Sequence, residues 1–293
     1  MHTSTTSTVP LVSWTVAQLL EATQGYWLND QAPNTEIKRI LTDSRDAEAG
    51  DAFLALKGER FDAHAFITQV AEQGCQVAIV SQPIDAEICQ LVVPDTRLAL
   101  GQLGAYRRAQ NPQLKVIALT GSSGKTTTKE MLGSILSRIA PTLVTRGNLN
   151  NDLGVPVMLL ELRPEHQYAV MELGASHQGE IDYTSNLVQP LVAGIINIGT
   201  AHLGEFGGRD GICRAKSEIY AHIAPNGTSI VPAADDFADS IRQAVQTEQV
   251  LSFGAGGEIF ATEIELQAQS ATFKLNTPQG VRQVNLPFAG RSE

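Results

Sequence analysis

A run of small and hydroxylated residues between an apolar segment and a helical segment is the part of the sequence best suited to chemistry. Residues 120–127 read Thr-Gly-Ser-Ser-Gly-Lys-Thr-Thr and follow the apolar run 115–119. Glycines let backbone N–H groups approach phosphate oxygens, and a helix N-terminus adds partial positive charge. Lys125 adds a full charge, and Thr126 offers a hydroxyl to Mg²⁺. The strict phosphate-loop pattern has a glycine where this chain has Leu119, so we predict a shortened nucleotide-binding loop.

Three polar residues are expected at the same edge of a parallel sheet, where ligands bind beyond the carboxyl ends of the strands. Glu172 ends the apolar strand 168–172, which is the position of an acidic residue that holds Mg²⁺ directly or through water. The alternative for Glu172 is an exposed carboxylate at a strand end. His202 follows the next apolar run, although a lone histidine is more often a bystander. Lys216 lies beside Arg214, and spacing alone favours a solvated helix face for both.

Polar loops elsewhere offer candidate substrate contacts. The turn that contains Asn150 and Asn151 opens a helix near Pro156, so these amides either cap that helix or bind phosphate or sugar. Ser44 and Arg45 lie in a polar loop beside a short strand, and this pattern by itself is nonspecific.

Alternating strand and helix patterns predict the elements that position these residues. The expected strands are residues 53–56, 77–81, 91–93, 115–120, 142–145, 168–173, 191–198 and 228–231. A first short helix is expected to begin near Thr15. The other expected helices cover residues 64–73, 96–109, 125–139, 155–160, 179–187 and 211–223. Continuous apolar strands indicate a parallel, doubly wound sheet covered on both faces. After residue 258, period-two alternation indicates an antiparallel meander.

The predicted fold class is α/β, in two domains after a disordered tail at residues 1–13. A small α/β domain at 14–111 precedes a P-loop domain at 112–293, because Pro112 interrupts the helical pattern just before a new apolar strand. The length of 293 residues is about twice the ~150 residues usual for one domain.

Composition excludes several classes of protein. The hydrophobic share of 43% and the charged share of 18% are those of a globular chain, not of a coiled coil or a mostly disordered one. A net charge of −10 makes duplex nucleic acid an unfavourable partner. The three cysteines are widely spaced and lack a C-x-x-C pair, so we expect reduced thiols and a cytoplasmic protein. The sequence contains no secretory signal and no membrane span, and a monomer is favoured.

Several motifs in a fixed order resemble the Mur ligases, in particular their MurF type. From about Trp14 to Arg291 these motifs are D-S-R at 43–45, A-L-K-G-E-R-F-D-A-H-A-F at 55–66, the T-G-S-S-G-K-T-T loop, G-N-L-N-N-D-L-G-V-P at 147–156, M-E-L-G-A-S-H-Q-G-E at 171–180 and A-H-L-G-E-F-G at 201–207. Several ordered motifs are far more specific than any single one. The resemblance implies ATP-dependent addition of D-Ala-D-Ala to a UDP-N-acetylmuramoyl tripeptide in peptidoglycan synthesis, through an acyl phosphate.

The resemblance also implies roles for individual residues. The loop Gly121, Ser122, Ser123, Gly124, Lys125, Thr126 and Thr127 would bind ATP, with Lys125 on the transferring phosphate. Thr126 and Glu172 would hold one Mg²⁺, while His202 and a carbamylated Lys216 would support a second. The first domain would bind the UDP end, which makes Ser44 and Arg45 candidate contacts, with Asn150 and Asn151 nearer the reacting centre.

The chain departs from the Mur ligase pattern at one point, and two other functions are compatible with its sequence. Family members continue into a third, Rossmann-like domain, whereas this chain stops at Glu293, so we expect greatly reduced or absent ligation by this polypeptide alone. A folylpolyglutamate synthase-like ligase would share the ATPase core but take a folate. A noncatalytic module would bind nucleotide or UDP-sugar without turnover. A GTPase is disfavoured because the sequence lacks an N-K-x-D guanine signature.

Overall fold

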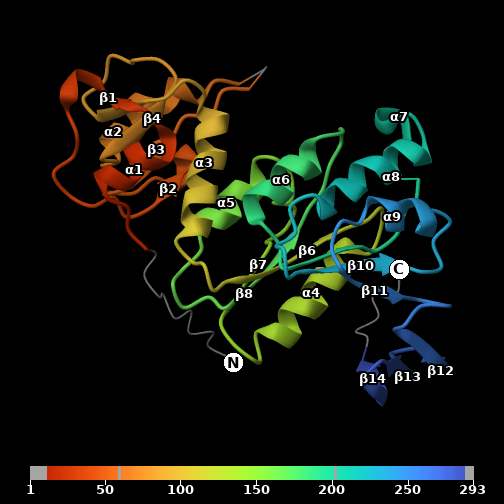
Figure 1. The fold of residues 1–293 in the computed structure, drawn as a ribbon. Helices are drawn as coiled ribbons and strands as arrows, with labels where there is room; N and C mark the ends of the chain where they lie inside the picture. The colour runs from red at the N-terminus through yellow and green to blue at the C-terminus, as the bar shows by residue number, and fades with distance from the viewer. Residues whose placement is uncertain (1–11, 59–60, 201–202, 288–293) are drawn as a thin grey trace. The chain divides into compact units, whose positions relative to one another are not determined.

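The computed structural model describes residues 12–58, 61–200 and 203–287. Contacts between Cα atoms divide the chain into two compact units, shown in Figure 1. The first unit comprises Met1–Leu114 and Thr145–Gln167, and the second comprises Lys115–Val144 and Tyr168–Glu293. The contacts therefore join residues 145–167 to the first unit, whereas the sequence predicted one continuous second domain from residue 112.

The first unit is built on a small mixed sheet. Its strands are β1 (Tyr26–Trp27), β2 (Ile40–Leu41), β3 (Ala52–Leu54), β4 (Val77–Val80) and β5 (Cys89–Val92). They are ordered β1-β5-β4-β3-β2, and only the pair β1–β5 is antiparallel. Its helices are α1 (Val16–Thr23), α2 (Ile67–Glu72), α3 (Thr96–Ala109) and α5 (Gly154–Leu160), with short 3₁₀ turns η1 (Leu28–Asp30), η2 (Ser44–Asp46) and η3 (Ala63–Phe66).

Alternating residues of the short strands feed two buried clusters in this unit. One contains Leu54 with Leu19 and Leu100, and the other contains Phe53 with Ile67. Successive side chains of a strand point to opposite faces, so the sheet carries apolar cover on both sides. The helices therefore flank a buried sheet, in agreement with the small α/β domain that the sequence predicted here.

Side-chain caps explain two of the helix starts. Thr15 and Gln18 form a reciprocal capping box at the start of α1, where the sequence predicted that a helix begins. Asp95 accepts hydrogen bonds from the N–H groups of Arg97 (2.7 Å) and Leu98 (3.0 Å) at the start of α3. The predicted bounds of α3 agree with the structure at both ends because a cap precedes it and Asn111-Pro112 follows it.

The second unit contains a six-stranded parallel sheet. Its strands are β6 (Lys115–Thr120), β7 (Thr142–Val144), β8 (Tyr168–Glu172), β9 (Val192–Ile195), β10 (Thr228–Pro232) and β11 (Gln249–Phe253). Their order is β11-β10-β9-β6-β8-β7, and every pair is parallel. The predicted doubly wound parallel sheet is confirmed. The strand β11 was not predicted, because polar residues surround its short apolar centre.

Helices cover both faces of this sheet. They are α4 (Lys125–Leu136), α6 (Glu180–Val188), α7 (Leu203–Phe206), α8 (Arg209–Ser217), the 3₁₀ turn η4 (Glu218–Tyr220) and α9 (Ala238–Ala244). In Figure 1 the helix α4 lies on one side of the sheet, and α6, α8 and α9 lie on the other. The predicted helix 211–223 was too long at its end, because the chain tightens into η4 after Ser217.

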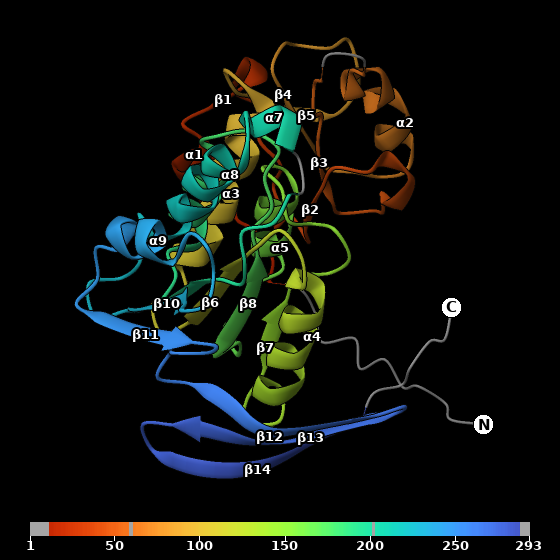
Figure 2. The ribbon, with the colours of Figure 1, turned by 90° about the vertical axis from the view of Figure 1, so that its right-hand side faces the viewer.

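A three-stranded antiparallel sheet follows the parallel sheet along the chain. Its strands are β12 (Phe260–Gln267), β13 (Ser270–Thr277) and β14 (Gly280–Pro287), which Figure 2 shows side by side. The turn between β13 and β14 contains Pro278, Gln279 and Gly280, and Gly280 adopts a φ of 120°. The predicted C-terminal meander is therefore confirmed. None of the helices in the described ranges is long and apolar enough to span a membrane.

Candidate functional site

The predicted phosphate loop joins the carboxyl end of β6 to the N-terminus of α4. Gly124 caps the helix with a φ of 78°, a conformation that glycine adopts without strain. The first four N–H groups of a helix have no intrahelical acceptor, so this end presents donors and partial positive charge to an anion. Lys125 Nζ donates to the carbonyl oxygen of Gly121 at 3.0 Å, which draws the ammonium back over the turn.

Close packing explains why the turn starts with glycine. A Cβ atom on Gly121 would lie 3.0 Å from the Cβ of Ile196, which is tighter than most contacts of a Cβ atom. The lack of a side chain at residue 121 therefore lets the turn lie against the chain after β9 without displacing Ile196.

Glu172 lies beside the loop, at the carboxyl end of β8. Its side chain is buried at 2% exposure, and the Oγ1 of Thr126 lies 3.5 Å from its Oε2. The alternative of an exposed strand-end glutamate is therefore wrong. A buried carboxylate facing a hydroxyl provides two oxygen donors of the kind Mg²⁺ prefers.

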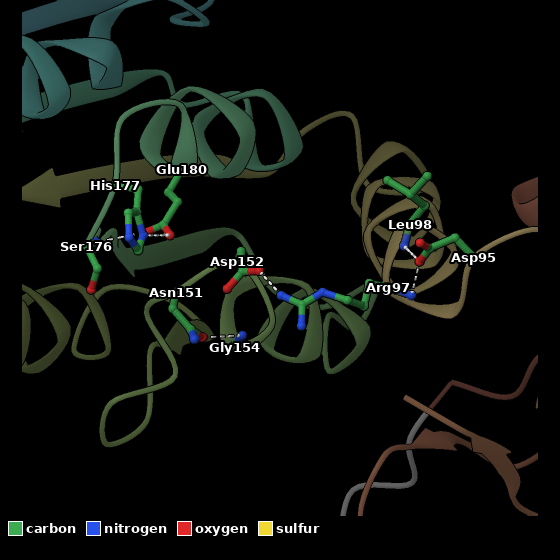
Figure 3. A network of polar contacts seen from close by, with 9 residues as sticks. All are labelled: Asp95, Arg97, Leu98, Asn151, Asp152, Gly154, Ser176, His177 and Glu180. Carbon is green, nitrogen blue, oxygen red and sulfur yellow. Dashed lines mark hydrogen bonds and ion pairs between the residues drawn. The ribbon is translucent and has the colours of Figure 1, made fainter. Parts of the chain in front are cut away.

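The loop after β8 is held by a second glutamate. Glu180 accepts a hydrogen bond from the N–H of Ser176 at 2.8 Å and contacts the Nδ1 of His177 at 3.1 Å (Figure 3). These contacts lower the pKa of Glu180 against the opposing effect of burial. The chain that leaves Glu172 is consequently fixed by its own polar contacts.

Lys216 is buried on α8, whereas Arg214 on the same helix is exposed. Lys216 is 6% exposed, so the solvated face that spacing favoured is wrong for this residue. Burial, and next the positive charge of Lys125, lower the pKa of Lys216 to about 8. A lysine with so low a pKa is neutral in a much larger fraction of molecules near neutral pH and can act as a nucleophile.

His202, the remaining predicted metal ligand, lies outside the described residues. Within the described ranges, no group of three or more histidine, cysteine, aspartate or glutamate side chains is arranged to hold a metal ion. The metal ligands therefore stay a prediction that rests on Thr126, Glu172 and Lys216.

Ser44 and Arg45 line a cavity of about 500 Å³ in the first unit. Phe53, Phe61 and Phe66 also line this cavity, and the rings of Phe61 and Phe66 stack at 5.6 Å. The Arg45 guanidinium is hydrogen-bonded to Asp43 and lowers the pKa of that carboxyl to about 2. Asp43 is thus ionised at any physiological pH, so an anionic ligand would compete with it for Arg45.

Asn150 and Asn151 also belong to the first unit. The Oδ1 of Asn151 accepts a hydrogen bond from the N–H of Gly154 at 2.8 Å and caps α5 (Figure 3). One of the two alternatives left open by the sequence, the cap, is therefore realised at Asn151. The next residue, Asp152, pairs with Arg97 of α3 at 2.5 Å and ties this turn to the first unit.

Comparison with known proteins identifies the family. The family model "Mur ligase middle domain" matches residues 119–293, and the model "Mur ligase family, catalytic domain" matches residues 36–119. The chain belongs to the Mur ligase family.

Individual Mur ligases are similar over nearly the whole chain. A UDP-N-acetylmuramoyl-tripeptide–D-alanyl-D-alanine ligase of Escherichia coli (strain K12) is 43% identical over 96% of this chain and 62% of its own length. A crystal structure of MurF from Acinetobacter baumannii is 78% identical, with a TM-score of 0.94, over 96% of this chain and 62% of that one. MurF from Thermotoga maritima in complex with ADP is 29% identical, with a TM-score of 0.77, over 84% of this chain and 57% of that one. The chain thus spans about three-fifths of the length of the curated relatives it matches.

Sequence reasoning missed one residue of this Mur ligase site. Asn197 follows β9, and its side chain bonds to the phosphate loop, 74 and 75 residues away along the chain. The available signal was a single polar residue in the apolar run 195–198 at a strand end. The same signal led to Glu172.

Proposed function

We propose that this chain is the nucleotide- and UDP-binding part of an ATP-dependent amide ligase of the MurF type. The observation that carries the proposal is the phosphate loop with Thr126 3.5 Å from the buried carboxylate of Glu172. Similarity to ligases of that type over 96% of the chain supports the substrate assignment, UDP-N-acetylmuramoyl tripeptide and D-Ala-D-Ala. The structure of the Thermotoga maritima relative is a complex with ADP, which supports ATP as the nucleotide here.

The proposed reaction has two bond-making steps. An oxygen of the tripeptide's terminal carboxylate attacks the γ-phosphorus of ATP, the bond to the β,γ-bridging oxygen breaks, and ADP leaves. The amine of D-Ala-D-Ala then attacks the carbonyl carbon of the acyl phosphate. The tetrahedral intermediate loses inorganic phosphate and a proton, which leaves an amide.

Negative charge accumulates at both steps, and the residues of the second unit are suited to offset it. The N–H groups at the start of α4 and the ammonium of Lys125 would bind the β- and γ-phosphates. Thr126 and Glu172 would hold Mg²⁺, which when bound neutralises charge on the phosphate oxygens. His202 is proposed as a ligand of a second ion.

Lys216 would support that second ion after carbamylation. Its neutral amine would attack CO₂ at carbon and release a proton, which turns a cation into a carbamate anion. The lowered pKa supports this assignment, because only the unprotonated amine carries the lone pair that attacks. Arg214 cannot replace it, since a guanidinium stays protonated.

The first unit is proposed to hold the UDP end of the substrate. The cavity beside Ser44 offers a hydroxyl, a guanidinium at Arg45 and aromatic rings, which suit a nucleobase joined to a diphosphate. Asn150 and Asn151 are proposed to contact the substrate nearer the reacting carboxylate. We place the enzyme in the cytoplasm, because ATP is available there and free cysteines such as Cys75 stay reduced. We expect it to be a monomer.

Ligand-dependent thermal unfolding tests the proposal on this chain. We expect Mg-ADP and UDP-N-acetylmuramoyl tripeptide each to raise the melting temperature, because a ligand that binds only the folded state stabilises it. Lys125→Ala should abolish the effect of Mg-ADP and keep that of the UDP-peptide. Stabilisation by a folate and not by the UDP-peptide would instead support a folylpolyglutamate synthase-like ligase.

A phosphate-release assay separates an enzyme from a binding module. The chain is mixed with ATP, the UDP-peptide and D-Ala-D-Ala, and both phosphate and the amide product are measured. Phosphate release that depends on the UDP-peptide, however slow, would exclude a noncatalytic module.

A further inference from the structure

The segment after β9 is bonded to the phosphate loop by its side chains and its backbone. Asn197 Oδ1 accepts hydrogen bonds from the N–H groups of Ser122 at 3.1 Å and Ser123 at 3.0 Å. Asn197 Nδ2 donates to the carbonyl oxygen of Ser123 at 3.1 Å. The backbone adds a bond from Gly199 N–H to Ser122 Oγ at 2.8 Å. One amide side chain thus binds two donors and one acceptor of the loop.

These bonds divide the loop into two parts. The N–H groups of Ser122 and Ser123 are taken by Asn197, while the N–H groups of residues 124–127 lie in the first turn of α4, where no helical carbonyl can accept them. The part that Asn197 holds is therefore next to the part that would receive phosphate. Fixing the first part limits the directions in which the donors of the second can point.

Asn197 is itself held from the other side. The N–H of Ile198 donates to Asp235 Oδ2 at 2.8 Å, and Arg209 Nη2 donates to the carbonyl oxygen of Ile198 at 2.9 Å. Arg209 also pairs with Asp236 at 2.8 Å and lies over the ring of Phe237. The amide of Asn197 consequently projects from a backbone segment with little freedom to shift.

The amide of asparagine suits position 197 better than the side chain of aspartate or of alanine would. An aspartate would accept from the same two N–H groups, but it cannot donate to Ser123 O and would place a negative charge beside the phosphates. An alanine would remove the side-chain partner of both Ser123 groups, while the N–H of Ser122 would keep its bond to the main-chain carbonyl of residue 197 at 3.1 Å.

We propose that Asn197 is a positioning residue of the nucleotide site, which orders the phosphate loop before the nucleotide arrives. The proposal rests on nucleotide binding at residues 121–127, as inferred above. Because the loop is already ordered, less conformational entropy is lost when phosphate binds. Asn197 thereby raises nucleotide affinity through the loop and not through contact with the ligand.

Calorimetric titration with Mg-ADP tests this role in the wild-type chain and in Asn197→Ala. We expect the variant to bind Mg-ADP about tenfold more weakly or worse, since the N–H and the carbonyl of Ser123 lose their side-chain partner and the N–H of Ser122 keeps only the main-chain carbonyl of residue 197. Asn111→Ala is the matched control, because the Asn111 amide makes two hydrogen bonds to backbone carbonyls within the first unit. It should lower stability and leave the affinity for Mg-ADP unchanged.

Asn197→Asp provides a second test if Asn197→Ala does not fold. Its affinity for Mg-ADP should fall below that of the wild type, and the loss should shrink at high salt because the new charge is screened. Unchanged affinity in both Asn197 variants would overturn the proposal. Tighter binding by Asn197→Ala would also overturn it, because the amide would then be a competitor of phosphate. Failure of the wild type to bind Mg-ADP would instead contradict the proposed function.

Discussion

At the scale of single residues, the site combines ionisable groups that are seldom buried. Glu172 and Lys216 are both more than nine-tenths buried in the second unit. Burial of a charge is costly unless a partner compensates it, so such groups are often associated with function. The burial of each residue leads to a separate prediction.

Glu172→Gln should weaken the binding of Mg-ADP about tenfold or more, because a neutral amide is a poorer magnesium ligand than a carboxylate. The affinity for ADP without magnesium should stay the same or rise slightly. Titrations with and without magnesium measure the difference. Glu248→Gln, an exposed glutamate of the same unit, is the control. Equal losses of affinity with and without magnesium would show that Glu172 does not bind the ion.

Lys216 should make the free energy of unfolding depend on pH. Its pKa is about 8 in the folded protein and about 10.4 in an unfolded chain. Between these values the unfolded state binds more protons, so stability should rise as the pH increases from about 8 to about 10. Below about pH 8 both states are protonated, and the cost of the buried cation is constant.

Lys216→Met removes this cost and should be more stable than the wild type at about pH 7. The advantage should shrink by roughly 3 kcal/mol as the pH rises to about 10, since one pKa unit corresponds to about 1.4 kcal/mol. Urea unfolding of both proteins in CO₂-free buffer measures it. A difference that is the same at both pH values would contradict the burial of an ionisable Lys216.

At the scale of elements, α4 must lie close to β7 if the phosphate loop is to keep its place. A Cβ atom on Gly133 of α4 would lie 2.8 Å from Val144 Cγ2 of β7. Glycine in the middle of a helix costs roughly 0.5–1 kcal/mol relative to alanine. Gly133 lowers the helix propensity of α4, but its lack of a side chain permits α4 to pack closely on β7.

Gly133→Ala should therefore destabilise the protein by about 1 kcal/mol or more, although alanine is the better helix former. Ser134→Ala, at an exposed neighbouring position of α4, should be neutral or slightly stabilising. Denaturant unfolding measures both. Introducing Gly133→Ala together with Val144→Ala should restore part of the loss, because the clashing methyl groups are gone. No such recovery would show that the packing of α4 on β7 is not the cause.

At the scale of the whole molecule, the two units are proposed to bind different ligands: the first unit the UDP end of the substrate, and the second unit the phosphates of ATP. Hydrogen exchange followed by mass spectrometry should separate them. Mg-ADP should slow exchange in residues 121–128 and 196–199, and UDP should slow it around residues 42–45, because a bound ligand suppresses local opening. Adenosine, which has no phosphates, is the control for the loop. Protection of residues 42–45 by Mg-ADP alone would contradict the division of roles.

Local sequence patterns were enough to predict much of this molecule. The strand β6, the glycine turn and the start of α4 were predicted because an apolar run, two glycines and a lysine lie next to one another in the chain. The same holds for α3, whose cap and terminating proline are close in sequence. The parallel sheet and the C-terminal meander followed from the spacing of apolar residues, which depends on neighbours two to four positions apart.

Other features depend on contacts between distant parts of the chain, and only the tertiary structure decided them. The bonds of Asn197 to Ser122 and Ser123 cross 74 and 75 residues, and no local pattern reports them. Burial of Lys216 and exposure of Arg214 depend on how α8 packs, because two residues of one helix differ in environment only once neighbours cover one face. Residues 145–167 join the first unit for the same reason, since α5 packs on α3 with Pro156 against Gly104. Sequence patterns report short-range periodicity, whereas burial and long-range pairing exist only after the chain has folded.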